Sequence, residues 1–225
     1  VTLSNAGAGY LTAPAVTFSS GAAAATAVLG PTSSGNPSVP QFDNQRLVLA
    51  GPPGSPQQFN MSKPGSYYNF DVTNPTQPDD GIQGVLVSGI LNEIRSMLSM
   101  QSGLIVFSNK AAWQIYGSQP GVAPSAVDIT AKPQAYNGAS HVPPIVANND
   151  ILFVQSKGNS VRNLSYSFYT NVFTGTDISV LSSHLFFGKE ITEWAWAEEP
   201  FKIVWAVRDD GVMLSLTFLK EQELI

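Results

Sequence analysis

Cysteine is absent from this chain of 225 residues, and charged residues make up only 12% of it. Without cysteine there is no disulfide, no thiolate nucleophile and no Cys-based zinc site. Lysine and arginine number only 11, are scattered, and leave a formal net charge of −5. A protein that binds nucleic acid through its phosphates needs clustered basic residues, so the composition argues against that function.

Long hydrophobic runs are also missing. No apolar run reaches about 18 residues, the length of a membrane-spanning helix, and the N-terminus lacks the basic-then-apolar layout of a signal peptide. We therefore expect no membrane-spanning segment. The sequence starts at Val1 and ends at Glu221–Ile225, directly after a strand-like run. We expect it to be part of a longer protein.

The chain does contain a series of short apolar runs, each followed by a turn and a second strand-like run. Their starts lie about 50 residues apart, a spacing typical of propellers, solenoids and other repeat arrays. The runs are rich in β-branched and aromatic residues and are too short for stable helices, so we predict core strands at Arg46–Ala50, Leu104–Phe107, Ile151–Val154 and Ile203–Val207. The predicted pairing partners are Gln58–Met61, Ala112–Tyr116, Val161–Tyr166 and Val212–Phe218.

The turns between these partners predict a repeated β-hairpin. They contain Gly54, Asn109, Gly158 and Gly211, and such residues supply the positive φ of tight turns. Further strands are expected between the hairpins, several of them alternating apolar with polar residues: Ile82–Val87, Ile94–Ser99, Ala126–Thr130 and Ile191–Trp196.

Two segments also satisfy helical spacing. Leu91–Ser102 is open to either interpretation, strand or short helix. Asp177–Phe187 is the best helix candidate: Asp177 is a possible cap, and four apolar residues share one face. These are Ile178, Leu181, Leu185 and Phe186.

We predict two parts in an all-β chain. Residues 1–36 are dominated by Gly, Ala, Ser and Thr, and the first charged residue is Asp43. We expect a small β module there, with strands at Ala15–Phe18 and Ala24–Leu29; a flexible linker is the alternative. Residues 37–225 are expected to form β-propeller blades, because a repeat of about 50 residues matches a four-stranded blade.

The chain is short for a closed propeller. Only some three or four blades fit in the chain, whereas closed propellers have about four to eight. Either the ring is unusually small or residues outside this sequence complete it. A β-sandwich with irregular strand lengths is the architectural alternative.

No catalytic, cofactor-binding or metal site is predicted. His141 and His184 have no neighbouring acid or ligand at metal spacing. The segments Asp79–Gly81 and Asp209–Gly211 suggest turns, because neither continues with the ligand spacing of an EF-hand loop. We expect a protein that is not an enzyme.

The acidic residues near two tryptophans are the most suggestive cluster. Paired carboxylates beside aromatic side chains can mark a glycosidase or a sugar-binding groove. The simpler interpretation is a solvated strand face followed by a charged loop. The residues are Glu190, Glu193, Glu198 and Glu199 beside Trp194 and Trp196.

Over residues 42–225 the sequence resembles the tail tubular, or nozzle, proteins of short-tailed bacteriophages. The matching segments occur in consistent order and consist mostly of strand cores and turns. They are Gln45–Gly51, Ser62–Phe70, Asp79–Ile82, Leu104–Ser108 with Trp113, Gln134–Pro144, Ile151–Gln155, Val161–Arg162, Ser165–Tyr166, Asp177–Leu181, His184–Phe186, Glu199–Pro200, Val204–Trp205, Arg208–Gly211 and Leu216–Phe218. The first segment, with Gly9–Tyr10, Pro14 and Val16–Phe18, is similar to a small β repeat of phage structural proteins.

This resemblance implies a structural virion protein that forms a homohexameric tube at the distal end of the tail, through which the genome is ejected. It implies contacts with the upper tail tube or adaptor protein and with tail fibres or spikes, and passage of DNA without sequence-specific binding. Subunit contacts are expected at aromatic residues, with Tyr67, Tyr68, Phe70 and Trp113 as candidates; for Trp113, burial in the core is the stronger expectation. A glycan-recognising propeller that uses Glu193, Trp194 and Trp196 is the alternative function.

Overall fold

The computed structural model of the protein describes residues 35–89, 91–167 and 172–219. It confirms the all-β prediction. The strands form four antiparallel sheets in chain order, and within these residues each sheet is open, with two free edges. The strands expected at Ala15–Phe18 and Ala24–Leu29 lie outside the described residues.

The first two sheets each contain four strands in sequential order. The first sheet consists of β1 (Val39–Asp43), β2 (Arg46–Ala50), β3 (Gln58–Met61) and β4 (Ile82–Val85). The second sheet consists of β5 (Ile94–Met100), β6 (Gly103–Ser108), β7 (Ala112–Tyr116) and β8 (Thr130–Ala135).

The third sheet repeats this plan, and the fourth has three strands. The third sheet consists of β9 (Ile145–Ala147), β10 (Asp150–Val154), β11 (Val161–Ser167) and β12 (Val172–Asp177). A short 3-10 helix, η1 (Val180–Phe186), leads to the fourth sheet. Its strands are β13 (Ile191–Ala197), β14 (Ile203–Arg208) and β15 (Met213–Thr217).

The predicted hairpin pairs are all present. In each sheet the predicted apolar strand pairs with the predicted second strand: β2 with β3, β6 with β7, β10 with β11 and β14 with β15. The turns at Gly158 and Gly211 have positive φ, 75° and 80°, as expected, whereas Gly54 and Asn109 do not have positive φ. Leu91–Ser102 contains strand β5, so its helical alternative is wrong.

Two predicted elements need correction. Only Thr130 of the strand expected at Ala126–Thr130 is in a strand; a short bridge between Ser125 and Asp128 bends the chain before β8 begins. The helix expected at Asp177–Phe187 is shorter, because β12 continues through Asp177. Asp177 does not cap η1; its Oδ1 accepts hydrogen bonds from the backbone N–H and hydroxyl of Ser179. Leu181, expected on the buried face, is 92% exposed.

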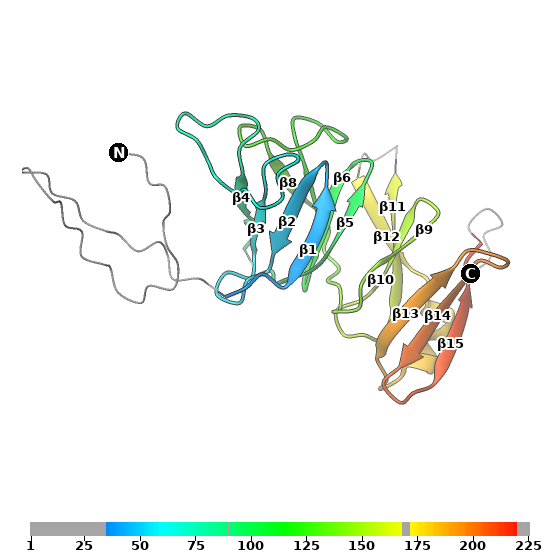
Figure 1. The fold of residues 1–225 in the computed structure, drawn as a ribbon. Coiled ribbons are helices and arrows are strands. Elements are labelled where there is room, and N and C mark those ends of the chain that lie inside the picture. Colours follow the sequence, from blue (N-terminus) through cyan, green and yellow to red (C-terminus); the bar gives the residue numbers. More distant parts are fainter. Residues whose placement is uncertain (1–34, 90, 168–171, 220–225) are drawn as a thin grey trace, which may run out of the picture.

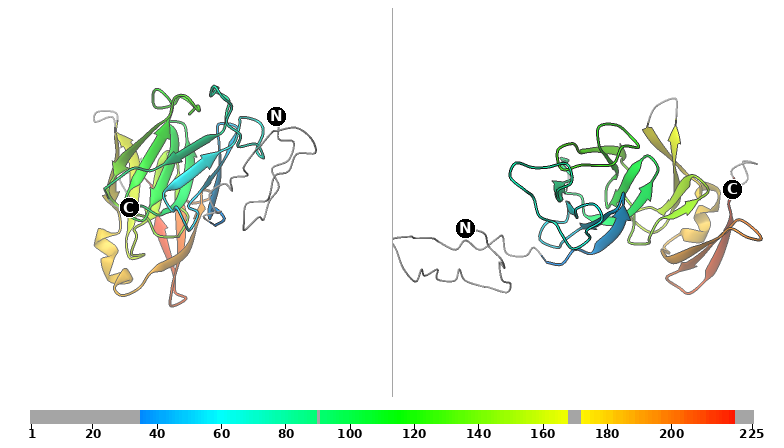
Figure 2. Two further views of the ribbon diagram at one scale, coloured as in Figure 1. Left: turned by 90° about the vertical axis from the view of Figure 1, so that its left-hand side faces the viewer. Right: turned by 45° about the horizontal axis from the view of Figure 1, so that its top comes forward.

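The sheets stack face to face in a row, in the order of the chain (Figure 1). One apolar cluster lies between the first and second sheets, built around Phe59, Met61 and Trp113. A second lies between the second and third sheets, where the rings of Phe107 and Phe153 are 5.2 Å apart. Two further clusters join the third sheet and η1 to the fourth. The first and fourth sheets therefore lie at opposite ends of the row, as a second view also shows (Figure 2).

Candidate functional site

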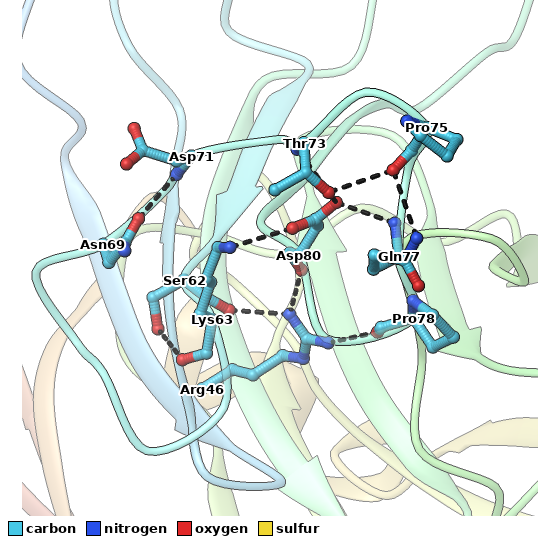
Figure 3. A network of polar contacts seen from close by, with 10 residues as sticks. All are labelled: Arg46, Ser62, Lys63, Asn69, Asp71, Thr73, Pro75, Gln77, Pro78 and Asp80. Carbon is cyan, nitrogen blue, oxygen red and sulfur yellow. Dashed lines mark hydrogen bonds and ion pairs between the residues drawn. The ribbon is translucent and has the colours of Figure 1, made fainter. Parts of the chain in front are cut away.

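A buried arginine anchors the long connection between β3 and β4, which we call the β3–β4 loop (residues 62–81) (Figure 3). Arg46 is the first residue of β2 and is 3% exposed. Its Nη1 donates to the carbonyl oxygens of Ser62 and Asp80, both at 2.7 Å, and its Nη2 donates to that of Pro78 at 3.1 Å. The guanidinium thus ties both ends of the loop to the sheet. Burial lowers the pKa of Arg46, and the carboxylates of Asp79 and Asp80 oppose that shift.

The carboxylate of Asp80 organises the middle of the same loop. Its Oδ2 accepts hydrogen bonds from the Gln77 N–H (2.8 Å), the Thr73 N–H (2.9 Å) and the Thr73 hydroxyl (2.6 Å). The ammonium of Lys63 lies 2.9 Å from Oδ1. The Gln77 and Thr73 hydrogen bonds and the Lys63 ammonium hold the pKa of Asp80 well below its usual range. The segment Asp79–Gly81 is a turn, as predicted, and Asp80 serves as the internal acceptor of the loop.

The anchored loop presents aromatic side chains at the surface. Tyr68 is 98% exposed, and Tyr67 packs edge-on against Phe42 of β1 with ring centroids 5.2 Å apart. Phe70 is half-buried and, with Val72, borders a hollow of about 360 Å³. Of the four aromatic residues predicted for subunit contacts, these three belong to the β3–β4 loop. The fourth, Trp113, is buried between the first and second sheets. This confirms the expectation that Trp113 belongs to the core.

The floor of the hollow is the outer face of the first sheet. Leu49, Asn60 and Gln83 are cross-strand neighbours on β2, β3 and β4, and all three border it. The register places the other outward-facing side chains of this sheet beside them, none of them charged: Pro40, Phe42, Leu47, Gln58 and Val85. This uncharged face, with the hollow and the aromatic loop at its border, is the candidate functional site. Its geometry suits contact with another protein surface.

The sequence signal for this site was incomplete. Arg46 is the first residue of a predicted core strand. A charged residue at the start of a buried strand was the only sequence feature that pointed to a buried arginine there. The sequence of the loop did not indicate that Asp80 accepts hydrogen bonds from Thr73 and Gln77 and pairs with Lys63. Those contacts depend on the backbone geometry of the loop.

The tryptophan and glutamate cluster is divided between two faces of the fourth sheet. Trp194 and Trp196 point toward the third sheet and pack on the apolar clusters there. The indole N–H of Trp194 donates to the Pro143 carbonyl at 2.6 Å. Glu193 precedes Trp194 in the strand and is exposed, so its carboxylate lies on the opposite face. The three residues therefore do not line one sugar-binding groove.

The remaining predicted residues are spread over the surface. Glu190, Glu198 and Glu199 are exposed, and so are His141 and His184. In the part of the chain that the structure describes, no three His, Cys, Asp or Glu side chains gather in a group that could hold a metal ion. Asp210 pairs with Arg208 across the predicted turn, and the hydrogen bonds from that guanidinium lower the pKa of Asp210 to about 2.

Comparison with known proteins gives no family assignment: no protein-family model and no curated protein matches the sequence. Among the described residues, no helix has the length and apolar character needed to cross a membrane.

Proposed function

We propose that this chain is a structural subunit of the tail nozzle of a short-tailed bacteriophage and does not act as an enzyme. The observation that carries the proposal is the chain-order stack of antiparallel sheets, each packed on the sheet before it. Such a stack is a rigid scaffold with large faces for assembly. It agrees with the resemblance to nozzle proteins over residues 42–225, which also consists of strand cores and turns.

The resembling segments correspond to the parts that build this scaffold. Leu104–Ser108 lies in β6 and Ile151–Val154 in β10, the central strands that are buried on both faces. Ser62–Phe70 and Asp79–Gly81 belong to the anchored β3–β4 loop. The resemblance therefore concerns the framework and its surface loop.

We regard the sheets as propeller blades. Three of them are four-stranded antiparallel meanders, the usual form of a blade, and the repeat length of about 50 residues agrees. The row is open between its first and fourth sheets. A closed ring would need additional sheets from elsewhere in the particle or from a longer chain.

In this function the chain forms a homohexameric tube at the tail tip, attached to the upper tail tube and to fibres or spikes. The net charge of −5 suits a conduit for DNA. An acidic surface repels the phosphate backbone, so the genome can pass without being held.

Location in the particle tests the proposal. Antibodies raised against the purified chain should label intact virions at the tail tip, and reconstruction of labelled tails should show a six-fold ring there. Label on the capsid alone, or particles that lack the protein, would reject a nozzle role. An antibody against the major capsid protein serves as the positional control.

A further inference from the structure

The connection between β8 and β9 (residues 136–144) carries the chain from the second sheet to the third. Three buried residues in it, 138–140, bond to both sheets, and we call them the crossing point. On the side of the second sheet, the Ala139 N–H donates to the Ser108 carbonyl at the end of β6, at 2.9 Å. The Ala139 carbonyl accepts from Nη1 of Arg95 on β5, also at 2.9 Å. The crossing point is thus fixed to two strands of the second sheet.

The crossing point is fixed to the third sheet as well. The Ser140 N–H donates to the carbonyl of Val154, the last residue of β10, at 2.9 Å. The Ser156 N–H, just beyond the same strand, donates to the Gly138 carbonyl at 2.9 Å. Separation of the second and third sheets at this point therefore breaks backbone hydrogen bonds that are buried in the stack.

Gly138 packs against the turn between β6 and β7. A Cβ at this position would lie 1.9 Å from the Asn109 carbonyl oxygen and 2.7 Å from the Lys110 backbone nitrogen. Both are backbone atoms, which cannot move aside as the end of a flexible side chain can. The position requires glycine because of this close approach, and Gly138 has no room to shift toward the turn.

Gly138 follows Asn137, and this is the one Asn-Gly pair in the sequence. Asparagine before glycine deamidates readily in a mobile chain, because glycine has no side chain to hinder ring closure. The Gly138 nitrogen attacks Cγ of Asn137, its proton passes to Nδ2, and ammonia leaves as the new N–Cγ bond closes a succinimide. Water then opens the ring. Its attack at Cγ gives aspartate, and its attack at the backbone carbonyl carbon gives isoaspartate.

The fold leaves Asn137 accessible but holds the backbone beside it. Asn137 is half-buried, so solvent reaches this residue. Ring closure turns the peptide unit between Asn137 and Gly138, because the nitrogen must approach Cγ. Gly138 cannot follow that rotation while it packs against the Asn109 backbone and its carbonyl oxygen is bonded to Ser156. The reaction therefore waits until the crossing point opens.

We propose that Asn137 is a modification site controlled by the sheet stack: it keeps its amide while the second and third sheets are joined, and it deamidates when they separate at the crossing point. The isoaspartate product adds one carbon atom, about 1.5 Å, to the backbone before Gly138. Gly138 then no longer fits against the β6–β7 turn, so the product prevents the crossing point from forming again. Opening of the stack becomes irreversible by this chemistry.

Deamidation rates test the first part of the proposal. The wild-type protein is kept in mildly alkaline buffer made with oxygen-18 water, either folded or unfolded in guanidinium chloride, and a synthetic peptide of residues 134–141 gives the unhindered rate. Peptide mass spectrometry follows the replacement of the Asn137 amide by labelled oxygen. We expect the unfolded chain to match the peptide and the folded protein to react about tenfold more slowly or less, because it must open first. Equal rates in the folded protein and the peptide would refute the proposal.

A substitution at the crossing point tests where the opening occurs. Arg95→Met removes the donor to the Ala139 carbonyl and should raise the rate in the folded protein about tenfold, the effect of one lost hydrogen bond to a charged group. Arg162→Met is the matched control, because Arg162 is also half-buried but donates within the third sheet, to the Gly175 carbonyl. Its rate should equal that of wild type. No acceleration by Arg95→Met, or equal acceleration by both variants, would overturn the assignment to the crossing point.

Refolding tests the irreversible step. The isoaspartate form of the unfolded chain is purified and refolded beside freshly prepared Asn137→Asp, which has the same charge and a backbone of normal length. We expect the Ala139 and Ser140 amides to be protected from hydrogen exchange in Asn137→Asp and to exchange freely in the isoaspartate chain. Equal protection in the two chains would show that the modified backbone still fits, and would refute the irreversible opening.

Discussion

At the scale of single residues, the main finding is a buried cation that stabilises a surface loop. Arg46 neutralises no carboxylate by direct contact; it satisfies the carbonyl groups of Ser62, Pro78 and Asp80. Buried carbonyl groups need partners, because an unpaired one loses its hydrogen bond with water without replacement. A planar guanidinium with several donors can supply all of them at once.

We expect Arg46→Met to lower the free energy of unfolding by about 3 kcal/mol, because buried carbonyl oxygens lose a charged donor. Chemical denaturation followed by tryptophan fluorescence measures this change. Arg162→Met is the matched control: Arg162 is half-buried and donates to the Gly175 carbonyl on the edge strand β12. A loss no greater than that of the control would show that Arg46 does not anchor the loop.

Asp80 should make the stability of the protein depend on pH. The pKa of Asp80 is lowered in the folded state from the ordinary value of 3.8. The ionised carboxylate therefore stabilises the fold above that value, and the contribution is lost as the pH falls toward the folded-state pKa. We expect the stability difference between wild type and Asp80→Asn to be constant from about pH 7 to pH 5 and to shrink below about pH 4.

Unfolding curves across this pH range for both proteins test the expectation, and Asp79→Asn serves as the charge-matched comparison from the same turn. A difference that does not change with pH would mean that the Asp80 carboxylate contributes through its shape alone.

At the scale of elements, the sequence predicted the central strands and missed only edge strands. The predicted central strands are β2, β6, β10 and β14; the apolar runs of β6 and β10 are buried on both faces by neighbouring sheets, and those of β2 and β14 on one face. The missed strands lie at sheet edges: β1, β9, β12 and most of β8. Two of these contain proline, Pro40 and Pro133, which natural sheets tolerate at edges because no ladder hydrogen bond is needed there. Edge strands lack a strong hydrophobic pattern, and this lack also makes an exposed edge less able to pair with another chain and aggregate.

The turns explain two of these misses. The β1–β2 turn consists of Asn44 and Gln45, both with positive φ, and the β9–β10 turn begins with Asn148, also with positive φ. Neither contains the glycine that usually marks such hairpins. The candidate site was even less predictable, because its hollow is formed where the β3–β4 loop returns over the outer face of the first sheet.

A glycine in β4 should be required for the packing of the first sheet. Gly84 lies directly opposite Phe59 of β3, and a Cβ at this position would overlap the Phe59 ring. We expect Gly84→Ala to lower the free energy of unfolding by about 2 kcal/mol, the usual effect of overpacking. Gln83→Ala, on the exposed side of the same strand, is the control and should change little. Equal stability of the two variants would contradict the ring-over-glycine arrangement.

At the scale of the whole molecule, the open ends of the sheet row connect the fold to the proposed function. Each inner sheet has two covered faces, whereas each end sheet has one. A single chain of stacked sheets cannot remove its ends unless the row closes on itself. In the homo-oligomer of the proposed function, contacts between subunits would cover these ends. The outer side of the apolar run Ile203–Val207, where Trp205 is 40% exposed, supports that proposal, and the sequence alone did not reveal it.

The charge of the whole molecule leads to a prediction about DNA. Nonspecific binding to duplex DNA depends on phosphate contacts by Lys and Arg, and basic proteins reach dissociation constants of about 10⁻⁴ to 10⁻⁶ M by this means. With a net charge of −5, the chain should show no binding in that range by fluorescence anisotropy, and lowering the salt should not reveal any. Replacing the exposed Asp71, Glu198 and Glu199 with Lys reverses the sign of the net charge and should introduce weak, salt-sensitive binding. Micromolar binding by the wild-type chain at physiological salt would contradict the idea that its surface lets DNA pass without holding it.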